Sequence, residues 1–421
     1  MPEPTATTFP AGFLWGAATA GHQVEGQNTA SDVWLLEHVA GSLFAEPSGD
    51  ACDSYHRYET DLDLIAGLGL NTYRFSLEWA RIEPEPGEWS RAALDHYKRV
   101  LEACHVRGLT PVVTYHHFVS PRWLLAQGGW ESPETVGRFA AFCERATRQL
   151  GDLIDVAATL NEPNLPDLLA RFGMIGGPRG SRARTPMLAG AAAALGVDPA
   201  TIAPFQLTYS DEAYDVRLAA HRAGRDAIKS VRGDLPVGWT LANSDIQGSD
   251  GAEELAASIR ADLNERFLVE SRGDDFVGIQ TYGRTVFAPD GTLAPVTEGA
   301  PVNSTGDEIY PAGLESTVRE AARIAEVPVY VTENGLSTDD DTQRVAYLRD
   351  AVSGVARCLA DGIDVRGYLA WSLLDNYEWV FGYRPKFGLV AVDRTTFERT
   401  PKPSAHWLGQ TARTNGAGLP V

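Results

Sequence analysis

Two glutamates, Glu162 and Glu333, each stand at the end of a short apolar run, and other polar and aromatic side chains close similar runs. These other residues are Arg74, His116, His117, Asn161, Tyr282, Asn334, Trp371, Glu378 and Trp379. Two carboxylates in such company, without a metal-ligand cluster, fit acid/base or covalent chemistry on a neutral molecule with several hydroxyl groups. A sugar is the natural candidate, because Trp and Tyr faces pack on pyranose C–H groups while Asn, Gln, His and Glu satisfy hydroxyls.

Each of these residues also has an ordinary structural interpretation. A glutamate after an apolar strand is most often a helix cap or a solvent-facing residue. The histidines and aromatic residues are compatible with core packing, and Arg74 is compatible with a structural ion pair. The joint occurrence of such groups at the ends of six different runs favours a functional site.

Eight β-rich runs of the sequence supply these ends. Each is followed by a longer segment in which apolar residues recur at every third or fourth position, as in an amphipathic helix. The runs begin near Trp15 and at Asn71, Thr110, Leu153, Leu235, Asp275, Pro328 and Val365. This alternation predicts an α/β fold, a single (β/α)8 barrel over residues 1–421. Its loops are expected to be elaborated at the C-terminal face of the strands, where reactive groups of such barrels lie.

A doubly wound open sheet would show the same alternation. That fold usually carries a Gly-rich first turn, and neither GxGxxG nor GxxxxGK[ST] follows any of the eight runs, so we prefer the barrel. The segment from Arg171 to Pro204 is rich in Gly, Pro and Ala and interrupts the alternation after the fourth run. We expect a long loop there, acting as a lid or forming a simple insertion.

The composition is that of a globular protein. Of 421 residues, 44% are hydrophobic and 22% are charged, and the formal net charge is −20. A field of that sign disfavours nucleic acids and anionic membranes as partners. The four cysteines have no metal-ligand spacing and are expected to be buried thiols. The first residues do not resemble a secretion signal and no apolar run has membrane length, so we expect a cytoplasmic protein.

Two segments carry a specific family resemblance. TLNEPN from Thr159 and VTENG from Val331 resemble the signature segments of family 1 glycoside hydrolases, the β-glucosidase family. FLWGAATAGHQVEG from Phe13, the block from Gly49 to EWARIEP, and GYLAWSLLDNYEW from Gly367 resemble further family segments in the same order. The likeness spans nearly the whole chain. It implies a barrel fold, a small-molecule β-glycoside as substrate, and no metal or organic cofactor.

The resemblance implies a retaining mechanism, with Glu162 as general acid and then base and Glu333 as nucleophile. Such carboxyls stand about 5 Å apart, so that one attacks the anomeric carbon while the other protonates the leaving oxygen. We expect burial and the facing charge of Glu333 to raise the pKa of Glu162, which must start protonated. Arg74 and Tyr282 would hold Glu333 ionised and oriented, and Asn161 matches the residue that binds the sugar 2-hydroxyl.

The sugar pocket is expected from further matched positions. Those that match hydroxyl-binding residues are Gln23, His117, Glu378 and Trp379, while Trp371 forms the floor and Phe387 the wall. A carboxylate at position 378 would repel a sugar phosphate, so an unphosphorylated glycoside is expected.

The family pattern is broken at several positions of this pocket. Phe118 replaces a usual Trp, and Gln280 with Thr281 replaces a usual Asn-Tyr. Asp307 stands where the family commonly has a Trp platform for the leaving group, and Phe381 replaces a frequent acidic residue. The aglycone preference therefore does not carry over.

Three activities are compatible with these residues. The first is hydrolysis of β-glucosides, with overlapping action on β-galactosides or β-fucosides. The second is transfer of the sugar to an acceptor other than water through the same covalent intermediate. The third is sugar binding by a barrel without turnover, which the intact set of catalytic positions disfavours.

Overall fold

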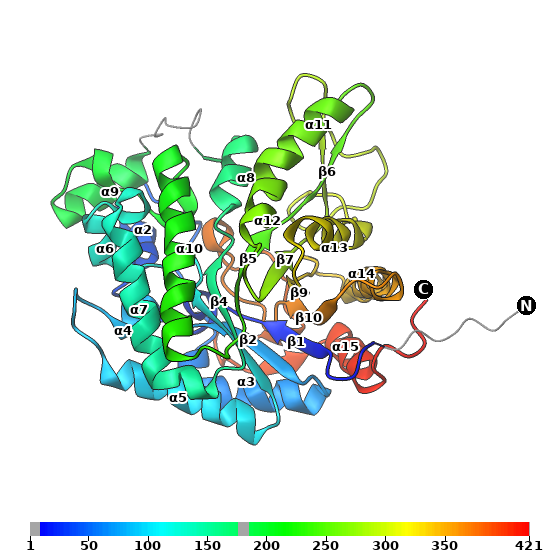
Figure 1. The fold of residues 1–421 in the computed structure, drawn as a ribbon, viewed down its shortest axis with the longest axis horizontal. Helices are drawn as coiled ribbons and strands as arrows, with labels where there is room; N and C mark the ends of the chain where they lie inside the picture. The colour runs from blue at the N-terminus through cyan, green and yellow to red at the C-terminus, as the bar shows by residue number, and fades with distance from the viewer. Residues whose placement is uncertain (1–8, 176–184, 421) are drawn as a thin grey trace, which may run out of the picture.

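The computed structural model describes residues 9–175 and 185–420. Its centre is a closed barrel of eight parallel strands in the order β1-β10-β9-β7-β5-β4-β3-β2 (Figure 1). These strands coincide with the eight β-rich runs of the sequence in chain order, which confirms the predicted barrel. They are β1 Leu14–Ala18, β2 Thr72–Ser76, β3 Thr110–His116, β4 Val156–Asn161, β5 Val237–Ala242, β7 Phe276–Gln280, β9 Val329–Glu333 and β10 Val365–Trp371.

Helices surround the barrel and connect its successive strands (Figure 1). The helix α7 shows why they pack there: its residues Phe139, Phe142, Cys143 and Ala146 recur at spacings of three and four and are all buried. The helices of the outer ring are α3 Ser54–Leu68, α5 Arg91–Val106, α7 Glu134–Leu150, α10 Asp211–Val231, α12 Arg266–Glu270, α13 Ala312–Ala325, α14 Asp341–Ala360 and α15 Pro403–Arg413.

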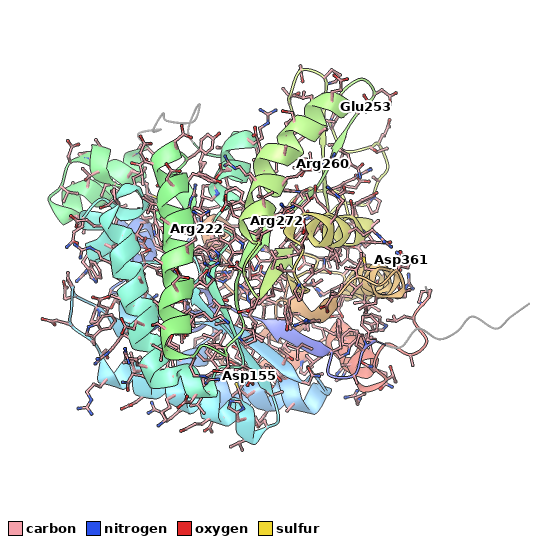
Figure 2. All side chains as sticks on the ribbon, viewed as in Figure 1. Asp155, Arg222, Glu253, Arg260, Arg272 and Asp361 are labelled. Carbon is pink, nitrogen blue, oxygen red and sulfur yellow. The ribbon has the colours of Figure 1, made fainter. Side chains whose placement is uncertain are left out.

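The outer faces of these helices are charged. Figure 2 shows Arg222 and Arg272 on the outside of the molecule, where they pair with Glu270 and Glu326. Exposed pairs of this kind contribute little to the free energy of unfolding. Stability therefore comes mainly from the apolar layer between the helices and the strands.

The interior of the barrel has its own packing layer. Val112, Ala158, Phe276, Tyr330 and Leu369 come from five different strands and form a buried apolar cluster. The alternate residues of the same strands belong to the larger cluster that includes helix side chains. Because successive side chains of a strand point to opposite faces, the first cluster fills the barrel and the second packs its outside. The barrel is thus a filled core, and a site can form only at its ends.

The loops at the carboxyl ends of the strands are elaborated, as expected. β6 (Asp245–Gly248) and β8 (Arg284–Phe287) pair in a small parallel sheet that the sequence analysis did not predict. α11 (Glu253–Arg260) packs beside it and continues through a π-helical turn, Ala261–Glu265, into α12. Strands β11 (Val390–Val392) and β12 (Arg399–Pro401) form a second small sheet.

The predicted loop from Arg171 to Pro204 is wrong for part of its length. Residues 176–184 lie outside the described residues, but Pro186–Leu195 forms the helix α9. Thr185 caps its first turn by accepting a hydrogen bond from the Leu188 amide. An Ala-rich stretch has high helix propensity, Pro186 stands in the first turn, and Gly196 ends the helix. Gly190, in the middle, packs closely against the Ala40 backbone. The helix packs against α2 (Asp32–His38).

The thiol prediction is confirmed, because Cys52, Cys104, Cys143 and Cys358 are all buried and free. None of the helices that the structure describes is long and apolar enough to cross a membrane.

The closure of the helix ring generates a stability prediction. α15 packs on both α14 and α3, and a Cβ atom at Gly409 of α15 would stand 2.0 Å from the Leu68 backbone oxygen of α3. Gly409→Ala should therefore force the helices apart and lower the free energy of unfolding by about 1–3 kcal/mol in urea denaturation. Gly67→Ala is the matched control, because no atom lies within 4 Å of its Cβ position. That control should raise stability by up to about 1 kcal/mol. Equal stability changes in the two variants would contradict the packing argument.

Candidate active site

Arg74 and Gln280 connect the two strands that carry the glutamates. Arg74 is fully buried in β2, and its Nη1 donates to Glu333 Oε1 at 2.6 Å while its Nη2 donates to Asn161 Oδ1 at 2.6 Å. Gln280 ends β7, and its Nε2 donates to the same two oxygens at 2.9 and 2.8 Å. Because Glu162 directly follows Asn161, both glutamates belong to the carboxyl end of the barrel.

The carboxylate of Glu333 is held through both oxygens. Oε1 accepts from Arg74 and Gln280, and Oε2 accepts from the Tyr282 hydroxyl at 2.7 Å. The neighbouring Asn334 donates to the Thr281 carbonyl at 2.7 Å, which ties the end of β9 to the chain after β7. Donors on both oxygens fix the orientation of the carboxylate.

Glu162 sits at a bend. The pairing of β4 with β5 shifts in register between Ala158 and Asn161, and Glu162 adopts a left-handed backbone with φ of 47°. Its amide donates to the Thr240 carbonyl at 2.7 Å. A left-handed conformation in a residue with a Cβ atom costs about 1–3 kcal/mol, so the surrounding contacts must maintain it.

The electrostatics separate the two glutamates. Burial, and then the negative charge of Glu333, raise the pKa of Glu162 well above its ordinary 4.5, with Arg74 acting in the opposite direction. Burial also raises the pKa of Glu333, but the charge of Arg74 and the hydrogen bonds from Tyr282 and Arg74 counteract the rise. The contacts of Glu333 therefore favour its ionised form more than those of Glu162 do.

Aromatic rings and a carboxyl line the neighbouring wall. The His117 ring stacks on Trp371 and Trp379 at centroid distances of 5.8 and 6.4 Å, and Phe118 meets Trp379 edge-on at 5.4 Å. Trp371 Nε1 donates to Glu378 Oε1 at 3.3 Å. Burial raises the pKa of the Glu378 carboxyl well above its ordinary value.

Gln23 and Phe387 complete the set. Gln23 Nε2 donates to Asn376 Oδ1 at 3.0 Å and to the Tyr377 carbonyl at 2.7 Å. Its Oε1 is buried and has no hydrogen-bond partner within the described part of the chain. Phe387 packs edge-on against Tyr282 with centroids 5.6 Å apart. The residues that the sequence analysis assigned to catalysis or to the sugar pocket thus lie in one group at the carboxyl end of the barrel.

His116 is not part of this group, although it stands beside His117. Its Nε2 lies 2.9 Å from Ser120 Oγ, and its ring packs on Trp130 and Phe205 at 4.8 Å in each case. The packing interpretation of this histidine is therefore the correct one.

The sequence analysis missed two supporting residues. Thr240 Oγ1 donates to Asn161 Oδ1 at 2.9 Å. The feature of the sequence that could have pointed to it is a hydroxyl side chain inside an apolar run. His22 stacks on Trp379 with centroids 5.9 Å apart, and its Nε2 lies 2.9 Å from Glu37 Oε1. The signal in the sequence was its place next to Gln23, in the block FLWGAATAGHQVEG.

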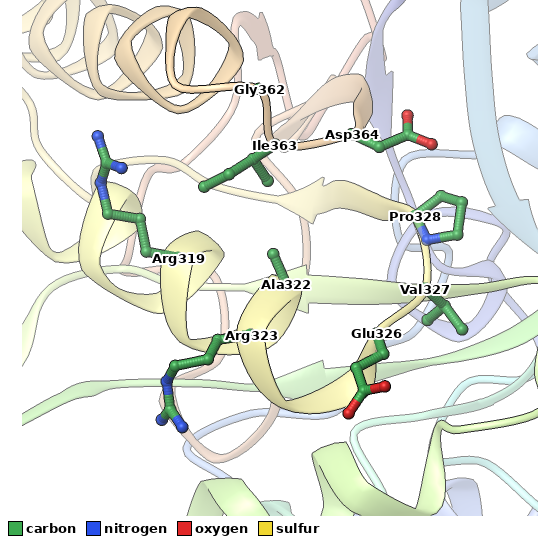
Figure 3. Close-up of a pocket in the computed structure, with 9 residues that line it drawn as sticks. All are labelled: Arg319, Ala322, Arg323, Glu326, Val327, Pro328, Gly362, Ile363 and Asp364. Carbon is green, nitrogen blue, oxygen red and sulfur yellow. The ribbon is translucent and has the colours of Figure 1, made fainter.

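A separate hollow lies where β9 and β10 begin, at the end of these strands opposite to Glu333 and Trp371 (Figure 3). Its charged side chains have partners: Arg319 pairs with Asp361, and Asp364 pairs with Arg366. The lining residues are Arg319, Ala322, Arg323, Glu326, Val327, Pro328, Gly362, Ile363 and Asp364. The hollow lies at the amino ends of the strands, whereas the active sites of such barrels form at the carboxyl ends.

Comparison with known proteins identifies relatives along nearly the whole chain. The solved structure titled beta-glycosidase BGL167 is 65% identical, with a TM-score of 0.95 over 98% of this chain and 99% of that one. The apo structure of a beta-glucosidase 1317 is 46% identical, with a TM-score of 0.90 over 97% of this chain and 99% of that one. A beta-glucosidase from an Agrobacterium species is 33% identical over 98% of this chain and 96% of the relative.

The family model described as glycosyl hydrolase family 1 matches residues 5–198 and 284–417. These ranges contain Glu162 and Glu333 together with Arg74, Asn161 and the sugar-pocket residues other than Gln280, whereas Tyr282 lies just outside them. The predicted family is confirmed: this chain belongs to glycosyl hydrolase family 1.

Proposed function

We propose that this chain hydrolyses unphosphorylated β-glycosides of the β-glucoside type with retention of configuration, using Glu333 as nucleophile and Glu162 as general acid and base. The observation that carries the proposal is the asymmetry of the two carboxyls. Glu333 is oriented by donors on both oxygens, while Glu162 faces its charge with a raised pKa. A nucleophile must be ionised and aligned, and an acid must hold a proton.

The reaction proceeds in two steps. A Glu333 oxygen attacks the anomeric carbon, and Glu162 gives its proton to the leaving oxygen as the glycosidic bond breaks. The ester that forms carries no charge, so one of the two causes that raise the pKa of Glu162 disappears. Glu162 then takes a proton from water, which attacks the same carbon and releases the sugar with its original configuration.

Asn161 is suited to the sugar 2-hydroxyl. Its Oδ1 already accepts from Arg74, Gln280 and Thr240, so its Nδ2 is the atom available to a ligand. That Nδ2 lies 3.3 Å from His117 Nε2, which places a second sugar-binding candidate beside it. A contact to the 2-hydroxyl strengthens as positive charge develops on the sugar ring.

The pocket wall supports a neutral sugar. The free Oε1 of Gln23 and the carboxyl of Glu378 are acceptors for hydroxyl groups, and Trp371, the expected floor of the pocket, supplies an indole ring for C–H groups. Acceptors of this kind do not neutralise a phosphate. The proposed substrate is therefore an unphosphorylated glycoside.

Replacement of the acid should lower kcat/KM by an amount that depends on the leaving group of the substrate. Glu162→Ala should lower kcat/KM for alkyl glycosides by about 10²–10⁴-fold and affect 2,4-dinitrophenyl glucoside far less, because a good leaving group needs little protonation. Initial rates across a series of aryl and alkyl β-glucosides measure this split. Glu320→Ala is the matched control, a mostly buried glutamate of α13 outside the site. Equal losses on all substrates would refute the acid role.

Removal of the nucleophile should abolish turnover on every β-glycoside. Glu333→Ala should lose nearly all hydrolysis of nitrophenyl β-glucoside, because no side chain remains to form the intermediate. Added azide should enter the vacated space and yield the α-configured glucosyl azide, identified by NMR. Hydrolysis at the wild-type rate by this variant would exclude the proposed nucleophile.

The dependence of kcat/KM on pH should be bell-shaped. Activity should fall at low pH as Glu333 gains a proton and at high pH as Glu162 loses its proton, so the basic limb should lie well above 4.5. The limbs report the carboxyl pair as one titrating system. Assays at each pH, with recovery at the optimum as the stability control, measure the profile. A basic limb near 4.5 would contradict the assigned proton position.

A further inference from the structure

The chain after Glu162 is anchored by the side chain of Asn164. This amide is fully buried, and it makes a two-point contact with the last residue of β5. Its Nδ2 donates to the Ala242 carbonyl at 2.6 Å, and its Oδ1 accepts from the Ala242 amide at 3.0 Å. The side chain thus bonds to the β5 backbone in the way that a neighbouring strand would, beyond the point where β4 loses its register with β5.

The same amide reaches the π-helical turn between α11 and α12. Asn164 Nδ2 also donates to the Leu263 carbonyl, which lies in this turn, at 3.2 Å. A π turn inserts one residue into a helix, widens it locally and often occurs near functional sites. Asn164 therefore joins the Glu162 segment to both the end of β5 and the helix behind it.

Glu162 needs such an anchor because its left-handed backbone is strained. Within the described residues, two hydrogen bonds hold its backbone: its amide donates to the Thr240 carbonyl, and its carbonyl accepts from the Leu165 amide at 3.0 Å. Further along, Asp167 of α8 (Leu165–Arg171) pairs with Arg217 and Arg266. Asn161 anchors the chain just before Glu162, and Asn164 is the first residue after it whose side chain bonds to another element.

The partners of Asn164 lie outside the ranges that the family model matches. Ala242 and Leu263 lie in residues 199–283, which the family model does not match, whereas Asn164 lies in the matched part. The anchor therefore joins the matched segment that carries Glu162 to a part of the chain that the family model does not match.

We propose that Asn164 is a positioning residue, which holds the Glu162 carboxyl at the leaving oxygen by clamping the bend to β5 and to the π turn. The inference rests on the acid role proposed above for Glu162. Because a displacement of about 1 Å costs about 10²-fold in rate, loss of the clamp should impair proton donation without removing the nucleophile.

The test compares Asn164→Ala with Asn264→Ala. Asn264 is an equally buried amide of the π turn, and it donates to the Ser244 carbonyl at 3.1 Å and to Glu320 Oε2 at 2.9 Å, away from Glu162. Both variants are assayed on an alkyl glucoside and on 2,4-dinitrophenyl glucoside. The amplitude of the initial dinitrophenolate burst gives the concentration of functional sites. Rates are divided by this concentration, so that an unfolded fraction of the sample does not lower them. If Asn164→Ala yields no folded protein, Asn164→Ser takes its place.

Asn164→Ala should lower kcat/KM about 10²-fold for the alkyl glucoside and only slightly for 2,4-dinitrophenyl glucoside. The basic limb of its pH profile of kcat/KM should also move. Asn264→Ala should lower both rates equally and leave the limb in place. In a Glu162→Ala background, the Asn164 change should cause no further loss on the alkyl glucoside.

Equal losses on both substrates in Asn164→Ala, or a full additional loss in the Glu162→Ala background, would overturn the positioning role while the acid role stands. If Glu162→Ala instead loses the same activity on every leaving group, the acid role itself is overturned. The two failures are therefore distinguishable.

Discussion

A positive charge buried in the barrel organises this site. Arg74 has no exposed surface, and its guanidinium donates to Thr114, Glu333 and Asn161. A cation in the interior is unfavourable unless an anion and several acceptors surround it. Glu333 is that anion, so each charge keeps the other stable away from water. The same guanidinium orients the Asn161 amide, and so one ion pair aligns groups from β2, β4 and β9.

The sugar wall is held by contacts that precede any ligand. Trp379 stacks with His22 and His117, and the indole of Trp371 bonds to Glu378. His22 in turn lies against the buried Glu37. A wall that is already ordered loses little conformational entropy when a sugar arrives, so more of the contact energy remains for binding. The barrel end and the pocket wall therefore both reduce the conformational entropy that is lost when a sugar binds.

The roles of the two glutamates could be predicted because the segments around them resemble the family signatures. The barrel could be predicted because most of its strands are largely apolar runs. Such a run is read from neighbouring residues alone. β6 and β8 were not predicted, because strands of four residues depend on a partner that is distant in sequence. The π turn at 261–265 was not predicted either, because it leaves no local pattern in the sequence. The contacts of Thr240 with Asn161 and of Asn164 with Ala242 depend on how β4 and the chain after it face β5, which spacing along the chain does not reveal.

The four buried cysteines have a practical consequence. Burial raises the pKa of Cys52, Cys104 and Cys358 to about 12 in each case, and that of Cys143 well above its ordinary value. Thiolate is the reactive form, and almost none exists at neutral pH while the core is closed. Alkylating reagents and oxidants can therefore attack these sulfurs only after the surrounding layers separate. The rate of thiol labelling under native conditions therefore reports how often the core of the protein unfolds locally or globally.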